Sequence, residues 1–544
     1  MMHLLTMHLA VSPNNLYSLY MNGAKHLKRY VVCLLLLCGT LAHAQSIDVQ
    51  HYKFEIDLSD QSDAIMCKAS IRVKFLEPAV QIQFDLASGA DENGMYVFQV
   101  KEDSHLLKTF HSNDVLTITL DKPATANEIR TFEISYMGTP KDGLIISKNK
   151  YGERTFFADN WPNRAHNWIP CNDTPADKAT VEFIVKAPLH YRVVSNGLLQ
   201  EEKALAGNQK LTHWKEVLPI PTKVMVIGAA DFAVQRVDSS YHIPVTAWVY
   251  TQDSTKGFYD YALGDDILKY FESYIGSYPY KKLANVQSTT IFGGMENAGA
   301  IFYDENTVTG TRSSEALMAH EIAHQWFGNT ATEKGFAHLW LSEGFATYLT
   351  DMYIQQKYGI DSFRKRLQQE RETVIAFSKK SQTPVVDSVS AFMDLLNANS
   401  YQKGAWVLHM LRHEVGDSIF QKIIRSYYNE YKFVNADTKD FQRVADSVSG
   451  KDLNWFFDQW LYRPGIPKLD IDMKVDGESF ELNIRQIGKP YRVTLELDII
   501  SATNQRTRRR IDVDGALTEM KIKTTGPFRV ELDPDKQLLY AEVD

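Results

Sequence analysis

The most informative stretch of the sequence is His320-Glu321-Ile322-Ala323-His324, which sets both the local structure and the chemistry expected of the central region. On a helix, residues four apart share one face, so both imidazoles can reach a single metal ion. Glu321 lies about 100° round the helix from His320, where it can hold a metal-bound water instead of binding the metal. This arrangement is typical of zinc metalloproteases, in which zinc lowers the pKa of the water and polarises the carbonyl while the glutamate takes the proton.

A catalytic zinc site needs a third protein ligand, and a second predicted helix offers Glu343, eighteen intervening residues beyond His324. Two histidines and one glutamate leave the fourth position open for water. Gly344 inside this helix costs about 1 kcal/mol relative to Ala, which indicates a close approach to another part of the chain. His338 is a competing ligand, but its spacing fits no motif, and we expect it at the surface or in the core. The alternative to a zinc site is an ordinary amphipathic helix with exposed His and Glu.

Apolar patterns on either side of this region predict the rest of the fold. Upstream, runs such as 52–58 alternate apolar and polar residues, with Asp, Gly and Pro between the runs, which predicts antiparallel β structure to about Tyr250. After Pro467 the alternation returns, and Asp476-Gly477 between two runs indicates a hairpin. Between these parts, longer apolar spacings predict helices over residues 265–274, 313–327, 338–358 and 401–415.

The expected fold is therefore an α+β multidomain protein with a sheet-rich N-terminal domain, a mainly helical catalytic domain and a small C-terminal β domain. The expected boundaries are 45–250, 251–464 and 465–544. No repeat of solenoid period and no low-complexity linker interrupts this order.

The first residues are typical of an export signal. Lys25, Lys28 and Arg29 precede the apolar run 30–38, and Ala42-His43-Ala44 supplies a small-x-small cleavage pattern. The run is shorter than the roughly 20 residues that span a bilayer, although an uncleaved anchor is the alternative. We expect a cleaved signal peptide over 1–44, with 1–20 as a non-native extension if Met21 is the true start, and a periplasmic or secreted protein.

Composition and charge indicate a globular protein and argue against nucleic acid as its partner. The 544 residues are 44% hydrophobic, 12% aromatic and 23% charged, which is globular composition. The formal net charge of −8 gives no basic excess, so nucleic acid is not an expected partner. Beyond the signal no long apolar run follows, so no transmembrane segment is expected in the mature chain. Removal of the signal peptide would leave Cys67 and Cys171 as the cysteines of the mature chain. Export permits a disulfide between them, but the sequence does not establish one.

Three further motifs stand in order with the zinc pattern. They are Pro170-Cys171-Asn172-Asp173-Thr174-Pro175 with Lys178-Ala179-Thr180, then Gly293-Gly294-Met295-Glu296-Asn297, and then Tyr401-Gln402-Lys403-Gly404-Ala405. Together these motifs resemble the gluzincin aminopeptidases, the family of aminopeptidase N and leukotriene-A hydrolase. The resemblance extends from about Tyr52 to the C-terminus, and a chance match to all the motifs is negligible.

The resemblance implies a role for each matching residue. One zinc ion per chain would be bound by His320, His324 and Glu343, with Glu321 as general base and Tyr401 as donor to the oxyanion of the tetrahedral intermediate. Glu296 would bind the free α-amino group, because a carboxylate forms charge-assisted hydrogen bonds with an ammonium. The other substrate-binding residues implied are Gly293, Gly294, Met295 and Asn297, whose glycines let a peptide backbone lie close.

The family fold comprises a β N-terminal domain, a thermolysin-like catalytic domain and a small β sandwich, which agrees with the expected order. Many members add a large helical C-terminal domain that closes the active-site cavity. Because this chain ends at Asp544, we expect a short form without that domain. Its cleft would then be more open or covered by a partner chain.

Several positions depart from the family pattern. Trp161 falls where a Gln usually lines the first substrate pocket, and Asp159 is an acidic neighbour that could compensate. Ser342 replaces the usual Asn before the zinc glutamate, and Thr350 stands where members often carry an acid near the metal ligands. Gly294 replaces the commoner Ala, as it does in the leukotriene hydrolase branch.

The leading hypothesis is an exported zinc aminopeptidase that acts on peptides with a free N-terminus. A zinc endopeptidase with an open cleft is the first alternative, suggested by Trp161 and the expected absence of the closing domain. A non-catalytic metal-binding protein is the second, although an intact set of ligands, base and tyrosine argues against it. Nothing positively supports epoxide hydrolysis, the further activity of the leukotriene branch. The sequence carries no signal for an oligomeric state.

Overall fold

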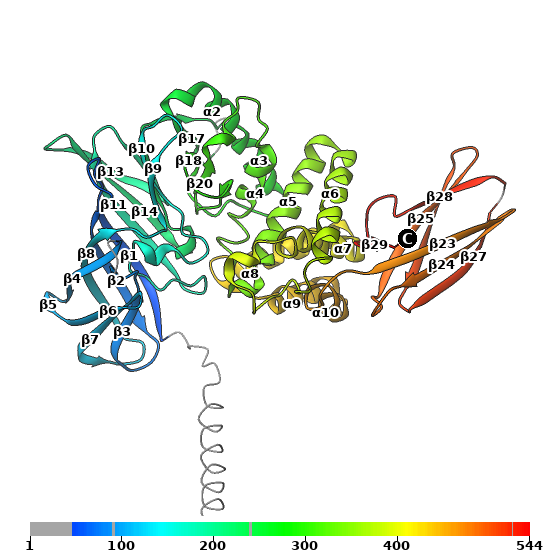
Figure 1. Ribbon diagram of the computed structural model, residues 1–544, viewed down its shortest axis with the longest axis horizontal. Helices are drawn as coiled ribbons and strands as arrows, with labels where there is room; N and C mark the ends of the chain where they lie inside the picture. The colour runs from blue at the N-terminus through cyan, green and yellow to red at the C-terminus, as the bar shows by residue number, and fades with distance from the viewer. Residues whose placement is uncertain (1–45, 90–92, 239–241, 525, 544) are drawn as a thin grey trace, which may run out of the picture.

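The computed structural model describes residues 46–89, 93–238, 242–524 and 526–543 (Figure 1). The signal peptide expected over 1–44 lies outside the described residues. Along the described chain, sheets come first, helices follow, and strands return at the end, as the apolar patterns predict. The α+β multidomain fold is thus confirmed.

An eight-stranded sheet forms the main body of the N-terminal region, drawn in blue to cyan in Figure 1. Buried side chains recur at every second residue over most of β1 (Ile47–Asp57), because successive strand side chains point to opposite faces. β1 pairs antiparallel with β2 (Ile65–Phe75) but parallel with β11 (Lys178–Pro188), so the sheet is mixed, not wholly antiparallel as expected. The strand order is β13 (Leu198–Leu205), β14 (Gln209–Pro221), β11, β1, β2, β8 (Ile129–Thr139), β4 (Gly94–Glu102) and β5 (His105–Leu106).

Two smaller sheets complete the N-terminal region. One has the order β12 (Arg192–Ser195), β15 (Ile227–Ala230), β10 (Arg154–Ala158) and β9 (Leu144–Lys148). The other has the order β3 (Ala79–Asp85), β7 (Val115–Ala124) and β6 (Lys108–Ser112). Cys67 on β2 and Cys171 are both buried, and both thiols are free in this structure.

A five-stranded sheet opens the central region. Its order is β16 (Phe232–Arg236), β17 (Val245–Tyr250), β18 (Leu283–Ser288), β20 (Ala300–Asp304) and β19 (Gly294–Met295). β16 and β17 precede residue 251, so the boundary expected there passes between strands of one sheet. β17 joins this sheet by pairing parallel with β18, and alternation within β17 alone does not reveal which sheet the strand joins.

Helices make up most of the central region (Figure 1). They are α2 (Ser254–Tyr261), α3 (Leu263–Tyr274), α4 (Glu315–Ala323), α5 (Trp340–Tyr358), α6 (Ile360–Ser378), α7 (Gly404–Val415), α8 (Asp417–Tyr431), α9 (Thr438–Ser449) and α10 (Asn454–Leu461). The short strands β21 (Thr332–Glu333) and β22 (Asn435–Ala436) pair with each other in parallel. No helix of the described residues is both long and apolar enough to cross a membrane.

Two of the predicted helices differ by three or four residues at one end, whereas α3 and α5 begin two residues from their expected starts. α4 stops at Ala323, four residues before the expected end, because the chain turns there, and Gly328 with φ +115° lies in that turn. The segment Asn399–Lys403, at the start of the predicted 401–415 helix, is a π-helix that leads into α7. Gly359 caps α5 with φ +86°.

The C-terminal strands form two facing sheets with a shared apolar core. One sheet has the order β27 (Leu517–Lys523), β24 (Ser479–Gln486), β23 (Lys468–Asp476) and β29 (Ala541–Glu542). The other has the order β26 (Arg506–Val513), β25 (Val493–Ser501) and β28 (Phe528–Leu532). β23 and β24 form the hairpin predicted at Asp476-Gly477.

Candidate metal centre and active-site cleft

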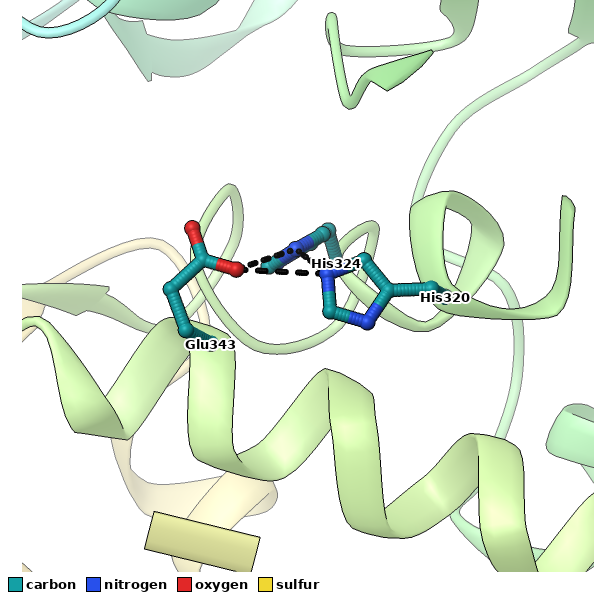
Figure 2. A group of neighbouring side chains, drawn as sticks. All are labelled: His320, His324 and Glu343. Atoms are coloured by element: carbon teal, nitrogen blue, oxygen red, sulfur yellow. Dashed lines mark hydrogen bonds and ion pairs between the residues drawn. The ribbon is translucent and has the colours of Figure 1, made fainter. Parts of the chain in front are cut away.

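Three side chains from α4 and α5 converge on one point (Figure 2). His320 lies in the last turn of α4, and His324 caps that helix in a helical conformation, so the two rings keep the spacing of neighbouring turns. Glu343 lies in the first turn of α5. Its Oε2 is 3.2 Å from His320 Nε2 and 3.3 Å from His324 Nε2, and the two nitrogens are 3.1 Å apart.

The donor set fits a zinc ion. Two imidazole nitrogens and one carboxylate oxygen are ligands that catalytic zinc uses, and a fourth position is then left for water or substrate. All three donor atoms lie within 4.8 Å of one another. Burial alone would raise the pKa of Glu343, but the two imidazoles outweigh it and hold that pKa well below its usual range. The carboxylate is therefore charged, as a metal ligand must be.

The ring of His324 is oriented by hydrogen bonds on the side away from the triad. Its Nδ1 is 3.1 Å from the carbonyl oxygen of Phe327 and 3.1 Å from Ser342 Oγ. A proton on Nδ1 donated to this carbonyl leaves Nε2 unprotonated toward the triad. Ser342, noted in the sequence as a departure from the family, thus lies directly behind a metal-ligand candidate.

Glu321 lies beneath the glycine loop that borders the cleft. Burial raises the pKa of its carboxyl well above the usual range, and the nearby Glu296 and Glu343 carboxylates add to this effect. A Cβ built on Gly294 would lie 2.3 Å from Glu321 Oε1, so the loop passes too close for a side chain without movement of Glu321. The backbone at Gly294 therefore packs directly on the Glu321 carboxyl group, and both line the cleft.

Tyr401 reaches the same cleft from the π-helix Asn399–Lys403. Its ring stacks on His320, with centroids 5.9 Å apart and planes 17° apart. Burial, together with the carboxylates of the cleft, raises the pKa of Tyr401 well above its usual range, so the phenol keeps its proton. π-Helical turns are rare and occur frequently at functional sites.

Glu296 is held by its backbone and leaves its carboxylate free for a ligand. Its carbonyl oxygen accepts hydrogen bonds from Gln325 Nε2 at 2.7 Å and Asn329 Nδ2 at 2.6 Å. The side chain is 5% exposed, and its Oε1 has no hydrogen-bond partner among the described residues. A buried carboxylate oxygen without a partner is costly, which indicates that a donor from a ligand completes this site.

One cleft of about 420 Å³ brings nearly all the predicted site residues together. Asn297 is the exception, because it is fully buried and does not line the cleft. His338 lies away from the cleft, with its Nδ1 2.9 Å from Thr438 Oγ1. The predicted residues that line the cleft are Gly293, Gly294, Met295, Glu296, His320, Glu321, His324, Glu343 and Tyr401.

Trp161 forms part of the cleft wall from the N-terminal region. It is 3% exposed, and its ring makes edge contacts with Phe292 and Phe336 at centroid distances of 6.1 and 5.9 Å. Asp159, the acidic neighbour noted in the sequence, does not line the cleft. Its carboxylate instead accepts hydrogen bonds from Arg164 and from the backbone N–H of Ile291.

Asp159 therefore supports the glycine loop, a role that the sequence did not predict. Its bond to Ile291 fixes the segment that enters the glycine loop. Burial raises the pKa of Asp159 to about 6 despite the opposing charge of Arg164. The Asn160-Trp161-Pro162 neighbourhood was the only sequence signal for this contact, and it pointed to the substrate and not to the loop.

Comparison with known protein families agrees with the geometry of the cleft. Residues 48–224 match the peptidase M1 N-terminal domain, and residues 259–460 match the peptidase family M1 domain. The chain belongs to peptidase family M1. The second match contains every residue that lines this M1 cleft except Trp161. The M1 family is generally zinc-dependent, which agrees with the donor set.

Relatives of this M1 chain include aminopeptidases from distant organisms. Probable aminopeptidase 2 of Sulfurisphaera tokodaii is 28% identical over 428 residues, which cover 73% of this chain and 54% of that protein. Glutamyl aminopeptidase of Bos taurus is 29% identical over 333 residues, covering 58% and 34%. The M1 chain thus spans about half the length, or less, of these relatives.

A solved structure shares the fold. Aminopeptidase A of Legionella pneumophila, in complex with aspartic acid, superposes with a TM-score of 0.81 over 93% of this chain and 60% of that chain. The sequence identity is 18%, so this likeness concerns the fold. It supports the sequence-based prediction of sheet, helical and C-terminal sandwich regions in that order.

Proposed function

We propose that this M1 chain is a zinc-dependent aminopeptidase that removes N-terminal residues from peptides. The observation that carries the proposal is the convergence of the His320, His324 and Glu343 donor atoms in the cleft that also holds Glu321, Tyr401 and Glu296. Metal ligands, a base, a phenol donor and an unpartnered carboxylate are the parts that hydrolysis at a free N-terminus needs.

Each of these residues has a chemical task. Zinc held by the triad would polarise the substrate carbonyl and lower the pKa of water. Glu321 takes the proton of the attacking water and passes it to the leaving amine. Tyr401 keeps its phenol proton at neutral pH and donates a hydrogen bond to the carbonyl oxygen as that oxygen becomes negative.

Recognition of the terminal amine falls to Glu296. Its unpartnered, buried Oε1 can accept a hydrogen bond from an ammonium group, which a peptide bond in mid-chain does not offer. The need for an ammonium group at Glu296 favours removal of terminal residues over cleavage within a chain.

The first test is metal content together with activity. The purified chain is expected to hold about one zinc ion, to hydrolyse short peptides, to lose activity with a chelator and to regain it with added zinc. A chain that hydrolyses peptides equally well after complete removal of zinc would refute the proposal. A chain that holds zinc but cleaves no peptide would favour the non-catalytic alternative.

Export through a cleaved signal peptide is part of the proposal. Basic residues, the apolar run 30–38 and Ala42-His43-Ala44 support it. N-terminal sequencing of protein from the native host is expected to begin at Gln45. Protein that retains the residues before Ala42 would contradict cleavage at this site.

A further inference from the structure

The part of the cleft formed by α6 and by the second and third turns of α5 has no task in the proposed chemistry. Thr347 and Thr350 of α5 and Arg366 and Glu370 of α6 line it. Arg366 is the only Lys or Arg among the described residues that line the cleft. Elsewhere the cleft presents the carboxyl groups of Glu296, Glu321 and Glu343, so Arg366 is the permanently cationic side chain that an anionic group would meet away from the metal centre.

Asp351 binds one edge of the Arg366 guanidinium group, and the other edge has no protein partner within the described residues. Its Nε donates to Oδ1 of Asp351, which is fully buried, while the Arg366 side chain remains 29% exposed. Nη2 lies 3.8 Å from Glu370 Oε1, beyond hydrogen-bond distance. Within the described chain neither Nη group has a protein acceptor in hydrogen-bond range, so both are available to a ligand.

Of the two acids beside Arg366, Asp351 forms an ion pair with it, whereas Glu370 does not reach hydrogen-bond distance. Burial, with the charge of Asp351 beside it, raises the pKa of Glu370 well above its usual range, so this carboxyl group opposes the charge of Arg366 less than an ordinary glutamate would. The hydroxyl groups of Thr347 and Thr350 donate to the carbonyl oxygens of Glu343 and Ala346 in their own helix. The hydroxyl protons of these two threonines are thus already donated, whereas the Nη groups of Arg366 are not.

The position of α6 decides which part of a peptide meets Arg366. β19, which leads to Glu296, packs on α4, whereas α6 packs on α5 and on the π-helix of Tyr401. Figure 1 shows α4, α5 and α6 in that order across the central region. If the amine lies at Glu296 and the reacting carbonyl at the triad, as the proposed function requires, the residue after the cleaved bond extends toward α6.

We propose that Arg366 binds a carboxylate carried by the leaving part of the peptide. The guanidinium group forms paired, charge-assisted hydrogen bonds with carboxylates, and its planar shape fits their two oxygens. Two sources offer this group: an acidic side chain on the second residue, or the free α-carboxylate of a dipeptide. This inference rests on the proposed function and specifies the substrates that the same site prefers.

The test compares peptides that differ only in this carboxylate. One pair of amidated dipeptides has Asp or Asn as the second residue. A second pair has one neutral sequence with a free or an amidated C-terminus. For the wild-type chain with zinc, we expect kcat/KM to be higher by about tenfold for the carboxylate member of at least one pair. The pair that shows the difference identifies the source of the carboxylate.

Variants connect this preference to Arg366. In Arg366→Gln we expect the ratio within each pair to fall to about one, and in Lys365→Gln, which removes a charge from the exposed face of the same helix, to stay at the wild-type value. Arg366→Gln leaves Asp351 buried without its partner, so the double variant Arg366→Gln/Asp351→Asn serves if the single variant fails to fold. The double variant is expected to lose the preference as well.

Two results would overturn the inference. One is a ratio near one in both pairs for the wild-type chain, and the other is an unchanged ratio in the Arg366 variants. Hydrolysis of the neutral peptides reports separately on the proposed function. If no peptide is cleaved, calorimetric binding of the same pairs to the wild-type and Arg366→Gln chains still decides whether Arg366 prefers the carboxylate member.

Discussion

Each of the three carboxyl groups in the cleft has different neighbours. Glu343 faces two imidazoles and stays charged, Glu321 faces the glycine loop and has a raised pKa, and Glu296 has a buried oxygen without a partner. Three residues of one acid type therefore suit three tasks: metal ligand, proton carrier and amine acceptor. Mutations that remove one carboxylate should separate these tasks.

The first prediction concerns Glu321. In Glu321→Gln we expect zinc content to stay near one ion per chain while kcat falls by about 10²–10⁴, because the proton acceptor is lost but the ligands remain. Glu343→Gln is the matched comparison, since it should lower zinc content and activity together. Metal analysis and steady-state kinetics measure both. Wild-type activity in Glu321→Gln would exclude it as the base.

The second prediction concerns Glu296. In Glu296→Gln we expect peptides with a free amine to bind about tenfold or more weakly, because a charge-assisted hydrogen bond becomes a neutral one. Inhibition constants for free peptides and their N-acetylated counterparts provide the measurement, and the N-acetylated set should change little. Equal weakening in both sets would remove Glu296 from recognition of the amine.

Among the elements, α5 and α7 meet at a contact that positions the catalytic tyrosine candidate. A Cβ on Gly344 would lie 2.9 Å from the backbone of Gly404, the first residue of α7. The close approach that Gly344 indicated in the sequence is thus confirmed, and the partner is the helix that follows Tyr401. The two glycines therefore let the segment that carries Tyr401 pack against α5, the helix that carries Glu343.

We expect Gly344→Ala to be destabilising even though Ala favours helices by about 1 kcal/mol over Gly. Overpacking against backbone costs about 1–3 kcal/mol, and separation of α5 from α7 would also move Tyr401 and lower kcat. Thermal unfolding and kinetics test this, with Gly335→Ala as control because a Cβ there meets nothing within 4 Å. A Gly344→Ala chain with higher stability and full activity would contradict the role of this contact.

Across the whole molecule, two lysine side chains of the N-terminal region bind polar groups of the central region. Lys223 Nζ lies 2.5 Å from Glu333 Oε1, with side chains 1% and 0% exposed. Lys178 Nζ donates to the carbonyl oxygens of Thr330 and Val434 at 2.7 and 3.0 Å. These contacts fix the region that carries Trp161 against the region that carries the metal ligands.

Lys223→Met is expected to lower the free energy of unfolding by about 3–5 kcal/mol, because Glu333 would remain buried without its partner. The double variant Lys223→Met/Glu333→Leu should recover part of this loss, since no buried charge remains. Denaturant unfolding of the three chains supplies the comparison. A single variant as stable as the wild type would show that the pair does not support the interface.

Helix α6 shows why the sequence predicted the metal centre better than the rest of the cleft. The triad follows from local spacing on α4 and one residue of α5, so a short motif suffices. The buried face of α6 includes Glu370 and Arg371 beside Phe363 and Leu367, so its apolar pattern is interrupted and gave no prediction. Arg366 therefore could not be placed in the cleft from the sequence.

Long-range pairing explains the other differences. β17 alternates like any half-buried strand, yet 32 residues separate it from its parallel partner β18. Alternation alone therefore groups β17 with the N-terminal strands and does not reveal its pairing with β18. Similarly, Asp159 binds the N–H of Ile291, 132 positions away, and no local pattern indicates such a contact.

The most direct test of the account is mass spectrometry of peptides incubated with the zinc-loaded chain, using free peptides and their N-acetylated counterparts with and without a chelator. We predict stepwise loss of N-terminal residues from the free peptides, no cleavage of the acetylated ones, and no reaction with the chelator. Internal cleavage of both sets would contradict the aminopeptidase assignment and identify an endopeptidase.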